Sequence, residues 1–155
     1  MKRLQDELKQ TRPFPTLEEE VLVGLARTAD ALQRGLAGIF KGSGLSPTQY
    51  NVLRILRGAG GPGLSCGEIA ERMVTRDPDL TRLLDRLEAR HLVSRARDGE
   101  DRRVVTTRIT QAGLSLLDEL EAPLAAEQRR MLGHLGEQQL RALADLLDEA
   151  RSGSK

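Results

Sequence analysis

Aromatic residues are scarce in this sequence. Its 155 residues include no Trp, one Tyr and two Phe, although 39% of them are hydrophobic. A buried core must therefore be built from Leu, Ala, Val and Ile, and such a core favours helices. The length is sufficient for one well-buried domain, or for a small domain with long appended helices, but not for two independent enzymes.

Cysteine and histidine are also rare. The single cysteine, Cys66, excludes an intramolecular disulfide, so we expect a reducing compartment. The two histidines, His91 and His134, lie far apart in the sequence, and neither is surrounded by residues at metal-ligand spacing. We therefore expect both histidines to be structural or solvent-facing, and we expect no metal and no cofactor.

Long apolar runs and enzyme motifs are missing as well. Residues 1–15 are polar and charged, and no later stretch approaches the ~20 apolar residues that span a bilayer, so we expect a cytoplasmic protein without a membrane partner. The sequence contains no GxSxG, P-loop, Gly-rich dinucleotide turn or HExxH motif. We therefore expect that the protein is not an enzyme.

The most informative pattern lies in residues 77–109. Asp77 before Pro78 is a helix-start signal, which predicts a helix that begins at Pro78. The leucines of this helix recur at the spacing i, i+3, i+4 and i+7, with mostly charged residues on the opposite side. The apolar stripe consists of Leu80, Leu83, Leu84 and Leu87, and the other side carries Arg82, Asp85, Arg86 and Ala89. One face is expected to pack, and the other is free to contact a partner.

A β-hairpin is predicted directly after this helix. Beyond His91 the sequence alternates as a strand does, and one side of that strand carries Val93, Arg95 and Arg97. Residues 104–109 are mostly β-branched and form the expected partner strand. The loop at 98–103 begins with a turn-forming Asp-Gly and ends with the adjacent guanidinium groups of Arg102 and Arg103. This hairpin is a candidate wing.

Capping boxes mark the starts of three further helices, because Ser or Thr is followed three residues later by Glu or Gln. The pairs are Thr16 with Glu19, Ser46 with Gln49, and Ser65 with Glu68. The first helix should reach about residue 41, and the second should end at the Gly-rich stretch 58–63. The short third helix, a tight turn, the helix from Pro78 and the hairpin together predict a winged helix-turn-helix.

Residues 111–150 are expected to form the C-terminal helices. Thr110 can cap the first of them, and Pro123 should kink or split it. A junction at Leu135 and Gly136 precedes a final amphipathic helix. The apolar stripes of these helices and of the helix at 16–41 exceed what the central module can cover, so we expect a homodimer.

Charge is distributed unevenly along the chain. Residues 82–110 hold eight Arg and five acids, a net charge of +3, whereas residues 111–155 hold five basic residues and eight acids, a net charge of −3. The net charge of +1 for the whole chain conceals this asymmetry. The local excess of arginine favours a polyanionic partner.

These motifs resemble those of the MarR family of bacterial transcriptional regulators over residues 16–150. The matching stretches are LSPTQYNVLRIL at 45–56, SCGEIAERM at 65–73, LTRLLDRLEARHLVSR at 80–95 and DGEDRRVVTTRITQAG at 98–113. The resemblance implies a homodimer with intertwined terminal helices that binds a pseudo-palindromic, double-stranded DNA operator. Family members are usually repressors, and many release DNA when a small, often phenolic, effector binds between the dimerisation helices and the DNA-binding module.

The resemblance also implies which residues contact DNA. Asp79, Thr81 and Arg82 match positions near the start of the recognition helix that face the major groove. Arg102 matches the wing arginine that enters the minor groove, and Asp101 matches the acid that helps to orient the wing.

Arg86 and Arg103 are further candidates for DNA contact. Either could instead pair with an acid of the same module, namely Asp85, Glu88 or Asp101. Phe40 and Tyr50 are the aromatic candidates for lining an effector pocket.

The predicted fold is mainly helical with a small β-hairpin wing. It has an N-terminal arm and dimerisation helix at 1–44, a winged helix-turn-helix module at 45–110 and C-terminal dimerisation helices at 111–155. A winged helix that binds only proteins is an alternative, because the fold alone does not establish DNA binding. Redox sensing by Cys66, beside a helix N-cap, is another. Against it, Cys66 is predicted to share the packed face of Ile69, Ala70 and Met73.

Overall fold

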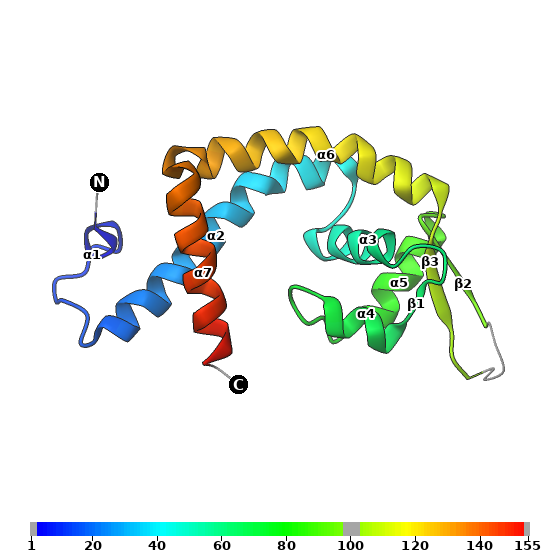
Figure 1. Cartoon of the computed structure of the whole chain (residues 1–155), viewed down its shortest axis with the longest axis horizontal. Coiled ribbons are helices and arrows are strands. Elements are labelled where there is room, and N and C mark those ends of the chain that lie inside the picture. Colours follow the sequence, from blue (N-terminus) through cyan, green and yellow to red (C-terminus); the bar gives the residue numbers. More distant parts are fainter. Residues whose placement is uncertain (1–2, 98–102, 154–155) are drawn as a thin grey trace. The chain divides into compact units, whose positions relative to one another are not determined.

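The computed structural model describes residues 3–97 and 103–153, and the chain forms two compact units, Met1–Leu36 and Ala37–Lys155. The strands are β1 (Leu64–Ser65), β2 (Val93–Ala96) and β3 (Thr106–Ile109). The helices are α1 (Leu4–Glu7), α2 (Leu17–Ser43), α3 (Pro47–Ala59), α4 (Cys66–Arg72), α5 (Leu80–Ala89), α6 (Gln111–Leu132), the 3-10 helix η1 (Gly133–Leu135) and α7 (Gly136–Ser152) (Figure 1). None of the helices in these two described stretches combines the length and apolar character that crossing a bilayer requires.

The first unit consists of α1 and most of α2. Helix α2 begins as predicted, because the Thr16 hydroxyl oxygen accepts a hydrogen bond of 3.2 Å from the Glu19 backbone N–H. Several apolar side chains of α2 are exposed in the single chain: Leu17, Val21, Leu22 and Leu25. Part of the predicted apolar stripe of α2 is therefore exposed in the described part of the chain.

The wing is a three-stranded antiparallel sheet in the order β1-β3-β2. The predicted hairpin is confirmed by the pairing of Val93 with Ile109. Strand β1 was not predicted, because two residues are too few to show an alternating pattern. Strand β3 begins at Thr106 instead of 104, and Val104 and Val105 remain exposed outside it.

The close approach of β1 to β3 depends on Gly63. Its φ of +72° lies in the left-handed region, and a Cβ there would come within 2.5 Å of the Thr107 carbonyl oxygen. Arg108 reinforces the contact, because its Nε donates a hydrogen bond of 2.9 Å to the Gly61 carbonyl. The loop after α3 is thereby fixed to the central strand of the wing.

The capping boxes of α3 and α4 are both confirmed. Ser46 Oγ accepts from the Gln49 N–H at 3.1 Å, and Gln49 Oε1 accepts from the Ser46 N–H at 2.9 Å. In α4, Ser65 Oγ accepts from the Glu68 N–H at 3.3 Å while Glu68 Oε2 accepts from the Ser65 N–H at 2.8 Å. The hydrogen bond from the Ser65 N–H is the main cause that lowers the pKa of Glu68, and a hydrogen bond from the Ser65 hydroxyl lowers it further. Local sequence alone therefore sets where α3 and α4 begin.

Helix α5 begins at Leu80, two residues later than predicted. Asp77 Oδ1 accepts a hydrogen bond of 2.8 Å from the Asp79 N–H, so Asp77 organises the turn before the helix and not its first turn. The predicted apolar stripe is confirmed, because all four leucines are buried: Leu80, Leu83, Leu84 and Leu87. Helix α5 packs against β2 and α4, and α3 packs against α6 and β3 (Figure 1).

The junction between α5 and β2 is tight. His91 has a φ of +57°, and its N–H donates to the Glu88 carbonyl at 2.8 Å while the Leu92 N–H donates to the Leu87 carbonyl at 3.0 Å. These paired bonds form a Schellman cap, which ends the helix and turns the chain directly into the strand. The His91 carbonyl then accepts from the Thr110 hydroxyl at 2.6 Å.

Helix α6 runs without interruption through Pro123, so the alternative that proline splits it is wrong. Pro123 lies on the exposed side, while Leu120 and Leu124 on either side of it are buried and hold both halves in place. The predicted cap is confirmed by the Gly113 N–H, which donates to Thr110 Oγ1 at 3.1 Å. The predicted junction also forms, at η1 and Gly136, where φ is +71°.

Candidate nucleic-acid interface

The exposed face of α5 carries the residues predicted to contact a partner. The Arg82 side chain is 75% exposed, and its Nη1 lies 3.6 Å from Asp79 Oδ2. Thr81 is also exposed on this side of the helix. Because an ion pair between such exposed groups is weak, the Arg82 guanidinium is available to a stronger anionic partner.

Arg86 lies one turn further along the same face and is exposed. Within the described ranges it has neither an ion pair nor a hydrogen bond through its side chain. It borders a polar hollow of about 240 Å³ between α5 and the first turn of α3, which is lined by Ser46, Thr48, Gln49, Asp77, Asp79, Leu83 and Arg86. The structure therefore brings Asp79 and Arg86 together at one hollow.

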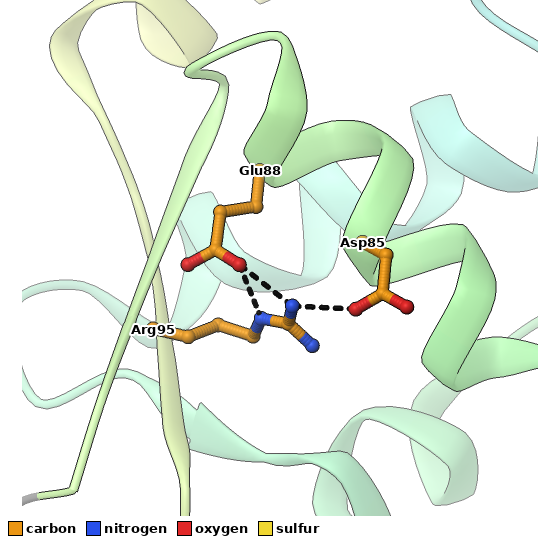
Figure 2. Close-up of polar contacts among 3 residues, drawn as sticks. All are labelled: Asp85, Glu88 and Arg95. Atoms are coloured by element: carbon orange, nitrogen blue, oxygen red, sulfur yellow. Dashed lines mark hydrogen bonds and ion pairs between the residues drawn. The ribbon is translucent and has the colours of Figure 1, made fainter.

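Two of the three acids that were possible partners of Arg86, namely Asp85 and Glu88, pair with Arg95 instead (Figure 2). Arg95 Nη2 lies 2.5 Å from Asp85 Oδ1 and 2.6 Å from Glu88 Oε2, and Arg95 Nε donates to Glu88 Oε2 at 2.9 Å. The hydrogen bond to Glu88 is the main reason why the pKa of Arg95 is raised. Among the described residues, neither acid therefore pairs with Arg86.

Arg95 was not among the predicted site residues, although the sequence contained a signal for it. The alternation of β2 placed Arg95 on the same side of the strand as the buried Val93. An arginine on the packed side of a strand requires an acidic partner nearby, and α5 offers Asp85 and Glu88 three residues apart.

Thr81 and Arg103 border a second hollow, of about 420 Å³, where α4, α5 and the base of the wing meet. Its lining residues are Ser65, Cys66, Gly67, Thr81, Leu84, Arg95, Arg103, Val104, Val105 and Thr107. Cys66 is exposed here, so the expectation that it packs with Ile69 in the core is wrong. Cys66 is the first residue of α4, and its side chain does not have to lie on the buried face of the helix. Asp101 and Arg102 lie outside the described residues.

Two long-range contacts fix the helix-turn-helix. Arg90, just after α5, donates from Nη1 to the Gly44 carbonyl at 2.7 Å and from Nη2 to the Ser43 carbonyl at 3.3 Å. Asn51 Oδ1 on α3 accepts from the Val74 N–H, in the turn between α4 and α5, at 2.9 Å. Sequence spacing could not reveal either contact, because the partners are 46 and 23 residues apart.

The predicted aromatic pair is in direct contact. The ring centroids of Phe40 and Tyr50 are 5.1 Å apart with an angle of 49° between the ring planes. Phe40 is buried, and the Arg54 guanidinium carbon lies 5.9 Å from the centre of the Tyr50 ring. The two rings therefore contribute to packing between the end of α2 and α3.

Comparison with known proteins agrees with this architecture. The family model described as the MarR family matches residues 43–104, from the end of α2 to the wing. The HTH-type transcriptional repressor MdtR of Bacillus subtilis is 30% identical over 124 residues, which cover 80% of this chain and 79% of that protein. The chain belongs to the MarR family. As a MarR-family protein it is a DNA-binding transcriptional regulator and not an enzyme.

Solved structures of related proteins have the same MarR-like fold. A MarR transcription factor from Planctomyces limnophilus is 42% identical, with a TM-score of 0.68 over 88% of this chain and 98% of that one. NadR in complex with 4-hydroxyphenylacetate is 26% identical, with a TM-score of 0.72 over 90% of this chain and 97% of that one. The predicted fold class, mainly helical with a small wing and long terminal helices, is confirmed.

Proposed function

We propose that this MarR-family protein is a homodimeric repressor that binds a pseudo-palindromic operator and is released by a small phenolic effector. The observation that carries the proposal is the division of α5 into two faces. Its leucines are buried, whereas the side chain of Arg82 on the other face is 75% exposed and Arg86 has no partner in the described part of the chain. A helix face that exposes two guanidinium groups and is fixed from behind suits insertion into a major groove.

The base contacts are assigned to the N-cap residue and the first two turns of α5. Arg82 and Arg86 have the planar guanidinium groups that recognise guanine or phosphate through paired hydrogen bonds. Thr81 can contact a base edge or a phosphate, and Asp79 can accept a hydrogen bond from cytosine.

The wing is assigned to the minor groove. Arg102 is the proposed inserted residue, with Asp101 orienting the loop and Arg103 at its base. The support is the sheet, in which Ala96 at the end of β2 pairs with Thr106 at the start of β3, so that both ends of the connecting loop are held together. Arginine is attracted to narrow A·T-rich minor grooves because the negative potential is concentrated there.

Dimerisation is assigned to the outer helices. In the single chain α7 has no buried residue, and Leu22 of α2 and Leu146 of α7 are 67% and 62% exposed. Apolar stripes of this kind are stable in water only when another surface covers them. A second copy of the chain is the proposed cover.

The effector assignment is supported by related proteins. MdtR is a repressor by name, and NadR was solved with 4-hydroxyphenylacetate, which is a phenolic acid. We assign Phe40 and Tyr50 to the lining of the effector site, because their rings lie together where α2 ends and α3 packs. Phenolic ligands pack well against aromatic rings.

Selection of bound fragments from the source genome would test the function and give the operator. We expect enrichment of a pseudo-palindromic duplex whose affinity falls steeply with salt concentration. Arg86→Ala should weaken binding, whereas Arg141→Ala should not, because Arg141 is an equally charged residue on α7 that pairs with Glu137. No enriched duplex, together with salt-insensitive binding to DNA, would favour a protein-binding winged helix instead.

A further inference from the structure

Arg95 connects the wing to the recognition helix. It lies on β2, three residues before the loop of the wing, and its side chain extends to α5 (Figure 2). There it contacts Asp85 and Glu88, which are one helical turn apart, with N–O distances of 2.5–2.9 Å. The Arg95 side chain is 22% exposed, against 54% for Asp85 and 39% for Glu88, so the guanidinium is the most enclosed of the three groups.

The directional nature of this contact distinguishes it from the apolar packing beneath it. Leu87 and Val93 are buried at the same junction, but apolar contact area is non-directional and tolerates rotation between a helix and a strand. A planar guanidinium that bonds two carboxylates from adjacent turns restricts that rotation, because each N–H must point at its acceptor. Arg95 therefore fixes the angle between β2 and α5.

The contact of Arg95 with Asp85 and Glu88 lies between the two elements that are expected to bind DNA, so the angle it fixes matters for DNA binding. Asp85 lies between Arg82 and Arg86 in the sequence, on the exposed side of α5, and β2 leads directly into the loop of the wing. If α5 contacts the major groove while the wing contacts the minor groove, the angle between α5 and the wing must match the spacing of the two grooves.

We propose that Arg95 is a positioning residue for operator recognition, which holds the wing at a fixed angle to α5 by bridging Asp85 and Glu88. The proposal rests on the proposed function, because it concerns how an operator is recognised. Arg95 touches no base in this role. Its contribution is specific to a DNA site that both elements contact, and DNA bound through charge alone does not need it.

The double substitution Asp85→Asn with Glu88→Gln separates positioning from charge. It removes two negative charges beside the DNA-facing arginines, so charge alone predicts tighter binding to every duplex. Loss of positioning predicts that affinity for the selected operator falls by about 2- to 30-fold relative to a duplex of the same composition in shuffled order. An operator-to-shuffled ratio equal to that of the wild type would overturn the proposal.

Arg95→Lys is the complementary variant, because it keeps the charge and removes the forked geometry. The ratio of operator to shuffled affinity should again fall, with an unchanged slope of log affinity against log salt concentration. Arg141→Lys is the matched control, since Arg141 makes an exposed ion pair with Glu137 on α7 and should leave the ratio unchanged. An Arg95→Lys variant that is folded and keeps the wild-type ratio would contradict the positioning role.

The wild-type protein distinguishes the two possible failures. If it shows no preference for any selected duplex, the proposed function itself fails. If it prefers the operator and the Arg95→Lys and double variants prefer it equally, only the positioning role fails. Thermal unfolding of each variant identifies loss of folded protein, which lowers both affinities together and leaves their ratio intact.

Discussion

Helices α5 and α7 have similar apolar patterns but opposite burial. The four leucines of α5 are all buried, with Leu87 fully so. Helix α7 also places leucines along one side, at Leu140, Leu143, Leu146 and Leu147, yet none of them is buried in the single chain. The spacing of leucines therefore predicts an apolar face but does not indicate which surface covers it.

The difference in burial follows from the elements that each helix contacts. Helix α5 contacts β2 and α4 of its own module, so its leucines leave water as the module folds. Helix α7 contacts mainly η1, which is three residues long and offers little apolar surface. We infer that α5 contributes to the stability of the single chain and α7 to the association of two chains.

The largest expected effect is on the folding of the module. Leu87→Ala should lower the free energy of unfolding by ~2–5 kcal/mol, because it leaves a cavity under a fully buried side chain. Urea denaturation of both proteins would measure it. Val74→Ala is the control, since Val74 is 87% exposed and its loss should change stability by less than ~0.5 kcal/mol. Similar effects of the two substitutions would contradict the assignment of α5 to the core.

The second effect is on association. Leu146→Asp should weaken the proposed dimer by ~2 kcal/mol or more, because a charge would be buried in the proposed subunit interface. Light scattering over a dilution series should show twice the chain mass for the wild type and a shift towards the monomer for the variant. Gln138→Asp, on the opposite and exposed side of α7, should leave the mass unchanged. A folded wild-type monomer at micromolar concentration would contradict the proposed dimer.

The third effect concerns the exposed face of α5. Arg82→Ala should weaken operator binding by ~1–3 kcal/mol if the side chain contacts a base edge. Its thermal stability should stay nearly constant, because the pair with Asp79 is 3.6 Å long and exposed. Titration of the operator would check the first statement and calorimetry the second. Operator affinity equal to that of Arg141→Ala would refute the base contact.

A smaller effect is expected in the wing. Arg102→Ala should lose roughly 1 kcal/mol on operators with A·T-rich flanks, less on matched G·C-rich ones, and flatten the salt dependence by about one phosphate equivalent. Arg103→Ala should lose less, because Asp101 or Glu100 is expected to hold it within the loop. Titrations of both variants on paired operators at two salt concentrations would compare them. Equal, small losses throughout would mean that the wing is only a solvated turn.

The smallest effect is local to the end of α5. His91 has a φ of +57°, which is strained for a residue with a Cβ. Glycine removes this strain but gives the unfolded chain more conformational entropy, so His91→Gly should stabilise the module by a net ~0.5 kcal/mol. Chemical denaturation would measure the change against His91→Ala, which should be close to neutral. A loss of stability on introducing glycine would show that the histidine side chain makes a contact of its own.

Much of the module could be predicted because its signals are local. The capping boxes at Ser46 and Ser65 and the leucine stripe of α5 each depend on residues within a few positions of one another. The exposed, charged side of α5 follows from that stripe, because the opposite side of a packed helix is exposed. The assignment of Asp79, Thr81 and Arg82 to DNA contact came from the resemblance to the MarR family. The contacts of the DNA-facing residues with an operator stay predictions.

Other features could not be predicted, for physical reasons. Strand β1 is too short to show a period, and Asp77 satisfies a turn where a helix start was expected. Cys66 has an apolar neighbour pattern but lies at the edge of α4, so it is exposed. Each of these features depends on where a short element begins or ends, which residue spacing alone does not fix.

The sequence by itself determined the order of the main helices, the N-terminal caps of α2, α3, α4 and α6, and the charged side of α5, since these depend on interactions within a turn or two of helix. Only the tertiary structure decided which arginine pairs with Asp85 and Glu88. Arg86 and Arg95 both lie within ten residues of Asp85 and Glu88, and charge alone cannot choose between them. The packing of β2 against α5 brings Arg95 to both acids, and this leaves Arg86 on the open face.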